Sequence, residues 1–259
     1  EKTAYLLAAS AGLYLSGMVF NDIFDRHTDA ADRPGRPLPS GRVSLRGAIG
    51  LGTVLMGLGI AAAAVTGSAG QVIGPILAIS VLAYDAGLKR TFLGPLAMGA
   101  CRFLNVLLGA SIVGPLESVT TPDTLQVAGG LGVYIVGVTW FGRREASTSS
   151  RVQLVGALLV INTGLGTLVA FAARVAAQNL TSVTLLLALI LVTINRRLIV
   201  AVRDPRANHV QSAMRTLLLS LVMIDAALVL AYSGQTEPAL ITAALIVPAV
   251  VLRKWVPMT

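Results

Sequence analysis

Nine stretches of almost uninterrupted apolar residues run through the chain, and they constrain its fold more than any other feature. A helix of about 20 residues crosses ~30 Å of lipid hydrocarbon. The stretches are Ala4–Phe20, Gly47–Val65, Val72–Tyr84, Leu93–Val113, Leu125–Phe141, Val152–Ala173, Leu180–Ile194, Met214–Tyr232 and Pro238–Val256. The third is short, and a start nearer Gly67 would lengthen it. Such long runs exclude a transmembrane β-barrel, whose strands alternate polar and apolar residues.

The composition also indicates a membrane protein. Of the 259 residues, 55% are hydrophobic and 12% are charged, whereas soluble domains carry about 25% charged residues. The 26 glycines favour close packing of helices in lipid, and the one cysteine, Cys101, cannot form a disulfide within the chain. These values exclude a soluble enzyme, a disordered chain and a disulfide-stabilised scaffold. They predict an all-α fold, a polytopic transmembrane helical bundle of about nine spans.

The basic residues gather at alternate ends of these stretches. All Lys and Arg residues except Lys2, Arg102 and Arg174 follow or close the first, third, fifth, seventh and ninth stretches. Short loops rich in Lys and Arg stay on the cytoplasmic side of a membrane. We therefore expect a multi-pass integral membrane protein whose active-site loops are cytoplasmic. The net charge of +8 then reflects topology, and no nucleic-acid partner is expected.

An acidic motif follows the first stretch and reads Asn21-Asp22-Ile23-Phe24-Asp25-Arg26-His27-Thr28-Asp29. On a helix, Asp22, Asp25 and Asp29 fall within about 60° of one face and over ~10 Å of its length. Three carboxylates in this arrangement repel one another unless a cation lies among them. Mg²⁺ is suited to this role because it uses one or two carboxylates together with substrate phosphates. The alternative is a solvated acidic helix end beside a basic loop.

A stiff basic loop comes next, with the sequence Arg33-Pro34-Gly35-Arg36-Pro37-Leu38-Pro39-Ser40-Gly41-Arg42. Its three prolines and two glycines prevent a helix. Arginines such as Arg33 and Arg36 are suited to binding phosphate oxygens in this rigid setting. The alternative is that they only anchor the loop on the positive side of the membrane.

A second polar motif, Tyr84-Asp85-Ala86-Gly87-Leu88-Lys89-Arg90, ends the third stretch. Lys89 and Arg90 would complement the charge of a phosphate group from the opposite side of the site. The alternative is an ion pair between Asp85 and Lys89, which are four residues apart on a helix.

A few polar residues lie inside the apolar stretches. Arg102 and Asn105 share one face of the fourth, Asn162 is near the middle of the sixth, and Asp225 is midway along the eighth. Ionisable groups at that depth are costly and usually face a cavity or each other. Arg102 is therefore expected either to pair with Asp225 or to contact substrate.

Taken together, these motifs resemble the UbiA superfamily of intramembrane prenyltransferases. The pattern Asn21-Asp22-x-x-Asp25-x-x-x-Asp29 followed by Arg36-Pro37-Leu38-Pro39-Ser40-Gly41 is similar to the first aspartate-rich motif of that superfamily. The stretch Tyr84-x-x-x-Leu88-Lys89-Arg90 resembles the end of a later helix. Asp85-x-x-Leu88-Lys89-x-Thr91, with Gly94-Pro95 and Cys101-Arg102-x-Leu104-Asn105, further resembles the EboC-like branch.

The resemblance implies one transmembrane prenyltransferase-like domain over residues 1–259. Its helices would surround a central cavity that opens to the cytoplasmic side and laterally to lipid. It also implies that Mg²⁺ bridges the first motif to a prenyl diphosphate. The implied metal ligands are Asn21, Asp22, Asp25 and Asp29. Arg36, Lys89 and Arg90 are the implied diphosphate contacts. From the motifs together we expect Asp25, Asp29, Lys89 and Glu145 to be catalytic. The residues expected to bind substrate are Arg33, Arg36, Tyr84, Arg90, Arg102, Asn105, Arg143 and Arg144.

The chain departs from the superfamily pattern in two places. The usual second aspartate motif is replaced by Thr139-Trp140-Phe141-Gly142-Arg143-Arg144-Glu145. Here Arg143 and Arg144 would stabilise a diphosphate directly in place of a second metal ion, and Glu145 is the one acid of this stretch. The superfamily also has one more helix before the span that leads into the first motif, and we expect that this helix is either absent from the protein or lies upstream of this sequence.

These observations predict a Mg²⁺-dependent prenyltransferase that moves a prenyl group from a prenyl diphosphate to a small acceptor and releases pyrophosphate. Glu145 or Tyr84 would handle the proton of the acceptor, and membrane lipid would surround the prenyl tail. One alternative keeps the fold but transfers a phosphoribosyl or other sugar group from its diphosphate to a polyprenyl phosphate. Another alternative, from a different class, is a small-molecule transporter.

Overall fold

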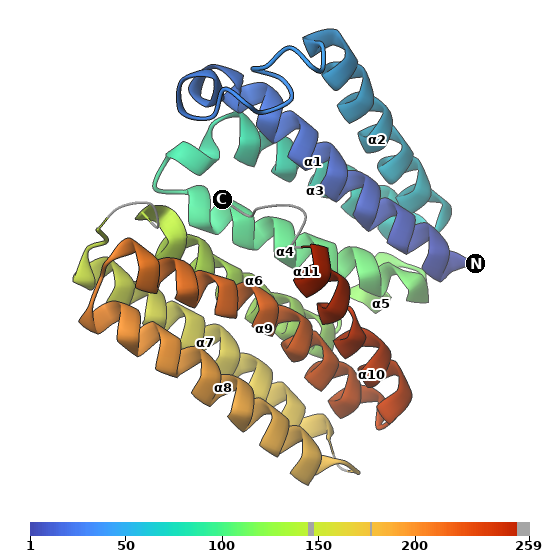
Figure 1. Ribbon diagram of the computed structural model, residues 1–259. Helices are drawn as coiled ribbons and strands as arrows, with labels where there is room; N and C mark the ends of the chain where they lie inside the picture. Colours follow the sequence, from blue (N-terminus) through green and yellow to red (C-terminus); the bar gives the residue numbers. More distant parts are fainter. Residues whose placement is uncertain (145–147, 177, 253–259) are drawn as a thin grey trace. The chain divides into compact units, whose positions relative to one another are not determined.

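The computed structural model describes residues 1–144, 148–176 and 178–252, and in these ranges the regular structure is helical throughout (Figure 1). The long helices are α1 (Lys2–Asp32), α2 (Leu45–Val65), α3 (Ser68–Ala86), α4 (Gly94–Ala110), α6 (Pro122–Phe141), α7 (Arg151–Val175), α8 (Leu180–Arg203) and α9 (Ala207–Ser233). The short ones are η1 (Leu88–Arg90), η2 (Ser111–Val113), α5 (Leu116–Val119), η3 (Gly142–Arg144), α10 (Thr236–Ala244) and α11 (Ile246–Leu252). The predicted all-α fold is confirmed.

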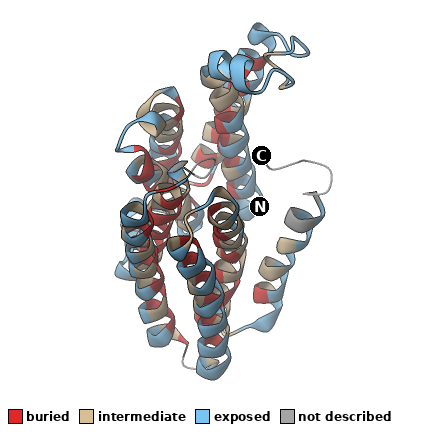
Figure 2. Cartoon of the chain, turned by 60° about the vertical axis from the view of Figure 1, so that its left-hand side comes forward, coloured by how far each residue is buried: buried red, intermediate tan, exposed pale blue. Residues whose placement is uncertain are grey.

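Among the described residues, eight helices are long and apolar enough to cross a membrane. Many of their large apolar residues are exposed, including Leu58 at 62% and Ile79 at 66%. Figure 2 colours exposed positions pale blue along the helices. Outward-facing apolar side chains of this kind are suited to contact with lipid tails. The third span starts at Ser68, so the start nearer Gly67 is confirmed.

The ninth apolar stretch does not form the single continuous helix that the sequence predicts. Residues 236–252 form two short helices, α10 of nine residues and α11 of seven residues. They meet at Leu245, and Pro248 has no backbone N–H to donate to the Ala244 carbonyl oxygen four residues earlier, so it cannot continue the hydrogen bonding of α10. Neither piece reaches the length of about 20 residues that a single span needs. The part of the predicted stretch from residue 253 onward lies outside the described residues.

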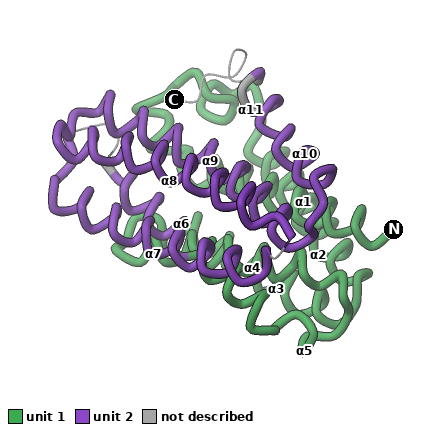
Figure 3. Tube along the Cα trace, turned by 90° about the horizontal axis from the view of Figure 1, so that it is seen from below, with its two compact units in different colours: residues 1–132 green, residues 133–259 purple. Residues whose placement is uncertain are grey.

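The chain divides into two compact units, residues 1–132 and residues 133–259 (Figure 3). In the first unit, α1 packs on α2 with glycines where the two backbones approach each other. A Cβ atom added to Gly12 would lie 3.2 Å from the Cα atom of Gly59. Close to this contact, the Ser16 hydroxyl donates a hydrogen bond of 2.8 Å to the Gly52 carbonyl oxygen. Small residues at helix crossings allow this separation in membrane proteins.

Helix α1 is longer than a bilayer requires, with 31 residues. Its last third carries the acidic motif, so the carboxylates project from regular helix beyond the apolar part. The helix ends at Asp32 because the residue before a proline disfavours helical backbone. Arg33, which precedes Pro34, has φ −143° and ψ 62°.

The second unit is organised around α7, α8 and α9. Asn162 on α7 and Asn195 on α8 form two reciprocal hydrogen bonds of 3.0 Å, from each Nδ2 to the other's Oδ1. Each amide also donates to the carbonyl oxygen four residues earlier on its own helix. The buried Tyr134 hydroxyl donates to the Leu217 carbonyl oxygen at 2.8 Å. These polar groups are therefore paired within the apolar unit, as such an environment requires.

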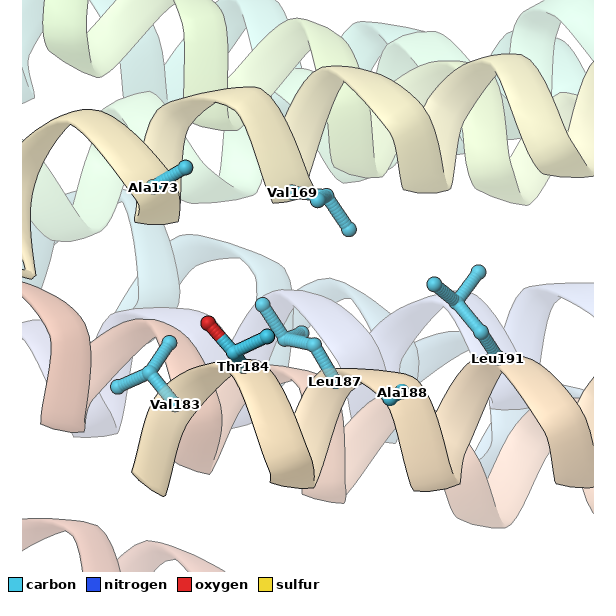
Figure 4. Close-up of a pocket in the computed structure, with 7 residues that line it drawn as sticks. All are labelled: Val169, Ala173, Val183, Thr184, Leu187, Ala188 and Leu191. Atoms are coloured by element: carbon cyan, nitrogen blue, oxygen red, sulfur yellow. The ribbon is translucent and has the colours of Figure 1, made fainter. Parts of the chain in front are cut away.

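The second unit also contains a small pocket of about 130 Å³ between α7 and α8 (Figure 4). Its lining consists of Val169, Ala173, Val183, Thr184, Leu187, Ala188 and Leu191. Thr184 is the one polar residue of this lining, so the pocket lacks the positive charge that would bind a diphosphate. The central cavity expected from the sequence stays a prediction.

Candidate functional site

The acidic motif on α1 meets basic side chains from two other segments of the first unit. We refer to Asp22, Asp25 and Asp29 as the α1 carboxylates, and to Arg36, Lys89 and Arg90 as the basic trio. Lys89 Nζ donates to Asn21 Oδ1 and to Asp25 Oδ2, both at 2.6 Å. The Arg90 guanidinium donates to the other oxygen of Asp25 at 2.9 Å. Both oxygens of Asp25 are therefore held by cations.

The remaining two carboxylates share Arg36. Its Nη1 atom lies 2.7 Å from Asp29 Oδ2 and 3.1 Å from Asp22 Oδ1. Asp29 is buried although it is charged, with 8% of the residue exposed. A carboxylate so enclosed requires a close counter-ion, which Arg36 provides.

The loop between α1 and α2 is folded so that Arg36 faces the acids. Ser40 donates its backbone N–H to the Arg36 carbonyl oxygen at 2.9 Å, and Val43 donates to Pro37 at 3.1 Å. Gly41 has φ +75°, a conformation that favours glycine. Arg42 donates to the Gly35 carbonyl oxygen and to the Ser40 hydroxyl. Arg42 thus stabilises the loop, while Arg36 is left to bind the carboxylates.

A 3₁₀ turn directs Lys89 and Arg90 toward α1. Helix α3 ends at Ala86, and η1 follows directly after Gly87. The Thr91 hydroxyl donates to the Leu88 carbonyl oxygen at 2.8 Å and closes the turn. A Cβ atom on Gly94 would lie only 2.9 Å from the Lys89 carbonyl oxygen. Glycine at this position therefore allows α4 to start tightly against η1.

The pair between Lys89 and Asp25 is the most sheltered contact of the basic trio. Their side chains are 13% and 23% exposed, whereas the Arg90 side chain is 59% exposed. Exposed ion pairs contribute little because water screens them. Lys89 is therefore the cation that most strongly fixes the position of Asp25.

The α1 carboxylates lie on one helix, but cations separate them into two groups. In the part of the chain that the structure describes, no three His, Cys, Asp or Glu side chains are grouped closely enough to hold a metal ion. The oxygens instead face Lys89 and Arg90 at one position and Arg36 at the other. Assignment of Asn21, Asp22, Asp25 and Asp29 as metal ligands stays a prediction.

Other predicted substrate-binding residues of the first unit have different surroundings. The Arg33 side chain is exposed and makes no hydrogen bond or ion pair with a described residue. Tyr84 is half-buried at the end of α3. On α4, Arg102 is half-buried, and Asn105 Oδ1 accepts a 2.8 Å hydrogen bond from the Ser10 hydroxyl on α1. Asn105 therefore joins two helices of this unit.

The predicted residues of the second unit are less fully described. Arg143 lies exposed in η3. Arg144 ends the same turn, and Glu145 lies outside the described residues. The pairing of Arg102 with Asp225 also stays a prediction, because the two residues belong to different units.

Asp85 was not among the predicted site residues, yet it lies in this region and is buried, with 5% of the residue exposed. The expected alternative, an ion pair with Lys89, does not form, because Gly87 ends α3 and Lys89 turns toward Asp25. The signal in the sequence was an acidic residue at the end of an apolar helix, where burial of a charge is costly.

Comparison with known proteins gives the same family as the motifs. A sequence model of the UbiA prenyltransferase family matches residues 2–198. The digeranylgeranylglyceryl phosphate synthase of Metallosphaera sedula is 34% identical over 94 residues, which cover 36% of this chain and 33% of the relative. The enzyme of that name from Saccharolobus solfataricus is 34% identical over 110 residues, covering 42% of this chain and 39% of the relative. The aligned segments thus span little more than a third of these relatives.

Two solved structures share the fold. One, described as giving structural and mechanistic insights into the biosynthesis of digeranylgeranylglyceryl phosphate synthase in membranes, has a TM-score of 0.66 at 17% identity, covering 89% of this chain and 85% of that chain. The apo structure of a UbiA homolog from Aeropyrum pernix K1 has a TM-score of 0.62 at 20% identity, covering 88% of each chain. Resemblance to the EboC-like branch stays a prediction. The chain is a multi-pass membrane protein and belongs to the UbiA prenyltransferase family.

Proposed function

We propose that the protein is a Mg²⁺-dependent intramembrane prenyltransferase that acts on a prenyl diphosphate and releases pyrophosphate. The observation that carries this proposal is the convergence of the α1 carboxylates and the basic trio in the first unit. Cationic side chains that reach acidic oxygens at 2.6 to 3.1 Å are also placed to bind phosphate oxygens. The apolar helices beside them offer an environment for an isoprenoid tail.

The side-chain oxygens proposed as metal ligands are of the kind that Mg²⁺ prefers. Hard cations take oxygen ligands, and the Asn21 amide together with Asp25 and Asp29 supplies them. These oxygens accept hydrogen bonds from Lys89 and Arg36 in this structure. A diphosphate competes for the same cations and leaves carboxylate oxygens available for the metal. Bound Mg²⁺ would stabilise negative charge on the leaving pyrophosphate.

The chain's own cations contribute to the same step. When the bond between the allylic carbon and its diphosphate oxygen breaks, negative charge develops on the pyrophosphate. Lys89 and Arg90 on η1, with Arg36 on the loop, are positioned to donate to those oxygens from two segments. Such preorganised donors stabilise charge in the transition state more than in the ground state. The carboxylates in turn keep the basic trio oriented before substrate binds.

The names of the relatives indicate which donor and acceptor to test first. The named relatives are synthases of digeranylgeranylglyceryl phosphate, which carries two isoprenoid groups on glyceryl phosphate. We therefore take geranylgeranyl diphosphate as the first donor to test. A glyceryl phosphate lipid with one free hydroxyl, geranylgeranylglyceryl phosphate, is the first acceptor. We also propose that the acidic motif and both basic segments face the cytoplasm, because the basic residues follow alternate spans.

The test uses purified protein in lipid nanodiscs with Mg²⁺ and labelled geranylgeranyl diphosphate. It is repeated with labelled phosphoribosyl diphosphate as the donor. Each donor is tested once with the glyceryl phosphate acceptor and once with a membrane lipid extract. The expected result is a prenylated lipid and pyrophosphate, seen by mass spectrometry, from the prenyl donor only. Pyrophosphate released from the sugar donor alone would overturn the proposal. Transmembrane flux of an uncleaved substrate would favour a transporter instead.

A further inference from the structure

Asp85 is a buried carboxylate without a close partner. It is the penultimate residue of α3, and 5% of it is exposed. Among the residues that the structure describes, it makes no hydrogen bond or ion pair. Burial of a carboxylate in that state is costly. Residues that retain such a cost inside a membrane protein are usually functional.

The carboxylate of Asp85 lies against α1 next to the candidate site. Its Oδ2 atom is 3.8 Å from the position of a Cβ atom added to Gly17. Gly17 precedes Asn21 by four residues, so Asp85 contacts α1 about one helical turn, or ~5.4 Å, from the metal-ligand motif. The displacement is toward the apolar part of both helices.

Two charged groups near Asp85, Lys89 and Asp25, belong to the candidate site. Lys89 and Asp25 act on its carboxylate electrostatically, and Asp85 in turn acts on the Tyr84 hydroxyl and the Cys101 thiol. Lys89 Nζ is already bound to Asn21 and Asp25. The carboxylate of Asp85 therefore lies near Lys89, a proposed diphosphate-binding cation, without being bound by it.

Under the proposed function, this position would match that of the reacting carbon of a prenyl donor. If Lys89 and Arg90 hold the diphosphate, as proposed above, the tail extends into the apolar region. The allylic carbon is one bond from the phosphate oxygens and so lies slightly deeper than the cations. A carboxylate about one helical turn deeper can reach an acceptor atom that attacks this carbon.

We propose that Asp85 is the general base that takes the proton of the acceptor hydroxyl. The inference rests on the proposed prenyl transfer. A bond forms between the acceptor oxygen and the allylic carbon, and the bond from that carbon to the diphosphate oxygen breaks. The electron pair of that bond leaves with pyrophosphate. The acceptor proton moves to an oxygen of Asp85 and is later released to water.

The role also limits the class of acceptor. An aliphatic hydroxyl is neutral at physiological pH and gains most from a base positioned at the attacking oxygen. A thiol ionises far more readily and has less need of one. We therefore assign neutral hydroxyl compounds as the acceptor class.

The experiment compares wild-type protein with Asp85→Asn, using geranylgeranyl diphosphate, Mg²⁺ and two acceptors. The acceptors are geranylgeranylglyceryl phosphate and its analogue with a thiol in place of the free hydroxyl. Asp85→Asn is expected to slow single-turnover transfer to the hydroxyl by about 10²- to 10⁴-fold. The deficit with the thiol is expected to be at least about tenfold smaller, and the Kd of the donor is expected to stay within about twofold. Asp85→Glu, which keeps a base, should recover part of the rate.

Three results would overturn the inference: transfer by Asp85→Asn close to the wild-type rate, an equal deficit with both acceptors, or loss of donor binding. The last two would make Asp85 a structural residue. Should Asp85→Asn fail to fold, Asp85→Glu provides the test. If Asp85→Glu folds and binds the donor but no longer transfers the prenyl group, Asp85 is not the general base. Wild-type protein that prenylates neither acceptor would instead refute the proposed function, and this inference with it.

Discussion

Lys89 Nζ lies 2.6 Å from Asp25 Oδ2, and this ion pair joins residues 64 positions apart in the sequence. The contact connects the turn after α3 to the acidic end of α1. Because both side chains are mostly shielded from solvent, water screens the attraction less than at an exposed pair. The pair therefore orients the two partners before any ligand arrives.

Replacement of Asp25 should remove the counter-ion of two cations and a proposed Mg²⁺ ligand at once. We expect Asp25→Asn to lower prenyl transfer by about 10²- to 10³-fold and to raise the Mg²⁺ concentration needed for half-maximal rate. Asp32→Asn, at the exposed end of the same helix, is the matched control and should change the rate by less than about twofold. Mg²⁺ titrations of initial rates provide the measurement. Equal effects of the two substitutions would contradict the assigned role of Asp25.

Arg36 should be needed for donor binding, whereas Arg33 should not. Arg36 bonds two carboxylates and faces the site, and the Arg33 side chain is exposed. We expect Arg36→Gln to lower kcat/KM for the prenyl diphosphate by about 10- to 100-fold, the value of one or two lost charged hydrogen bonds. Arg33→Gln should stay within about twofold. If both variants lose the same activity, the loop would act through its net positive charge and not through the geometry of Arg36.

The crossing of α1 and α2 should tolerate no side chain at Gly59. A Cβ atom there would lie 3.0 Å from the Leu13 backbone nitrogen and 3.2 Å from the Ala9 carbonyl oxygen. Because the backbone of α1 would have to shift by a few tenths of an ångström to make room, Gly59→Ala should destabilise the protein by about 1–3 kcal/mol. Gly57, on the same helix, has no atom within 4 Å of its added Cβ. Gly57→Ala should therefore be neutral or stabilising by up to ~1 kcal/mol. Thermal unfolding in one detergent compares them, and equal Tm values would contradict the close crossing.

The paired amides of Asn162 and Asn195 should contribute a measurable coupling between α7 and α8. Each single change to Ala leaves the other amide without its partner on the facing helix. A double-mutant cycle is expected to give a coupling energy of about 0.6 kcal/mol, with ~1.7 kcal/mol as an upper bound. Thr163→Ala, whose hydroxyl bonds only within α7, is the control and should couple to neither. A coupling of zero between the two asparagines would mean that they do not fix the pairing of the helices.

The helical fold was largely predictable because the length of an apolar run determines whether it can cross a membrane. Span ends agreed closely in several cases, as for the predicted Leu93–Val113 and the observed Gly94–Val113. The prediction of a ninth continuous span was wrong, because hydropathy does not reveal a break in a helix such as the one between α10 and α11. Length and apolarity predict that a segment is buried in lipid, but they do not predict that its helix is continuous.

The sequence was sufficient to predict which residues form the candidate site, but not which of them contact one another. The acidic motif and the basic residues near it were recognisable from their spacing. The partner of Lys89 was not, because Asp85 at i−4 is the expected partner on a helix. Gly87 signals that the helix can end, but the sequence does not show in which direction η1 then turns. The burial of Asp85 was not predictable either, because it depends on the packing of α3 against Gly17 of α1. Contacts between distant segments require the three-dimensional arrangement.

The contacts of the basic trio have a consequence for the order of binding. The α1 carboxylates and the basic trio carry three negative and three positive charges, so these six paired side chains are together electroneutral. A diphosphate that arrives alone would leave an excess of negative charge, and a divalent cation that arrives alone would leave an excess of positive charge. Each is therefore expected to strengthen the affinity for the other by the same factor, as thermodynamic linkage demands. Metal and donor are therefore expected to bind together, and each is expected to bind weakly in the absence of the other.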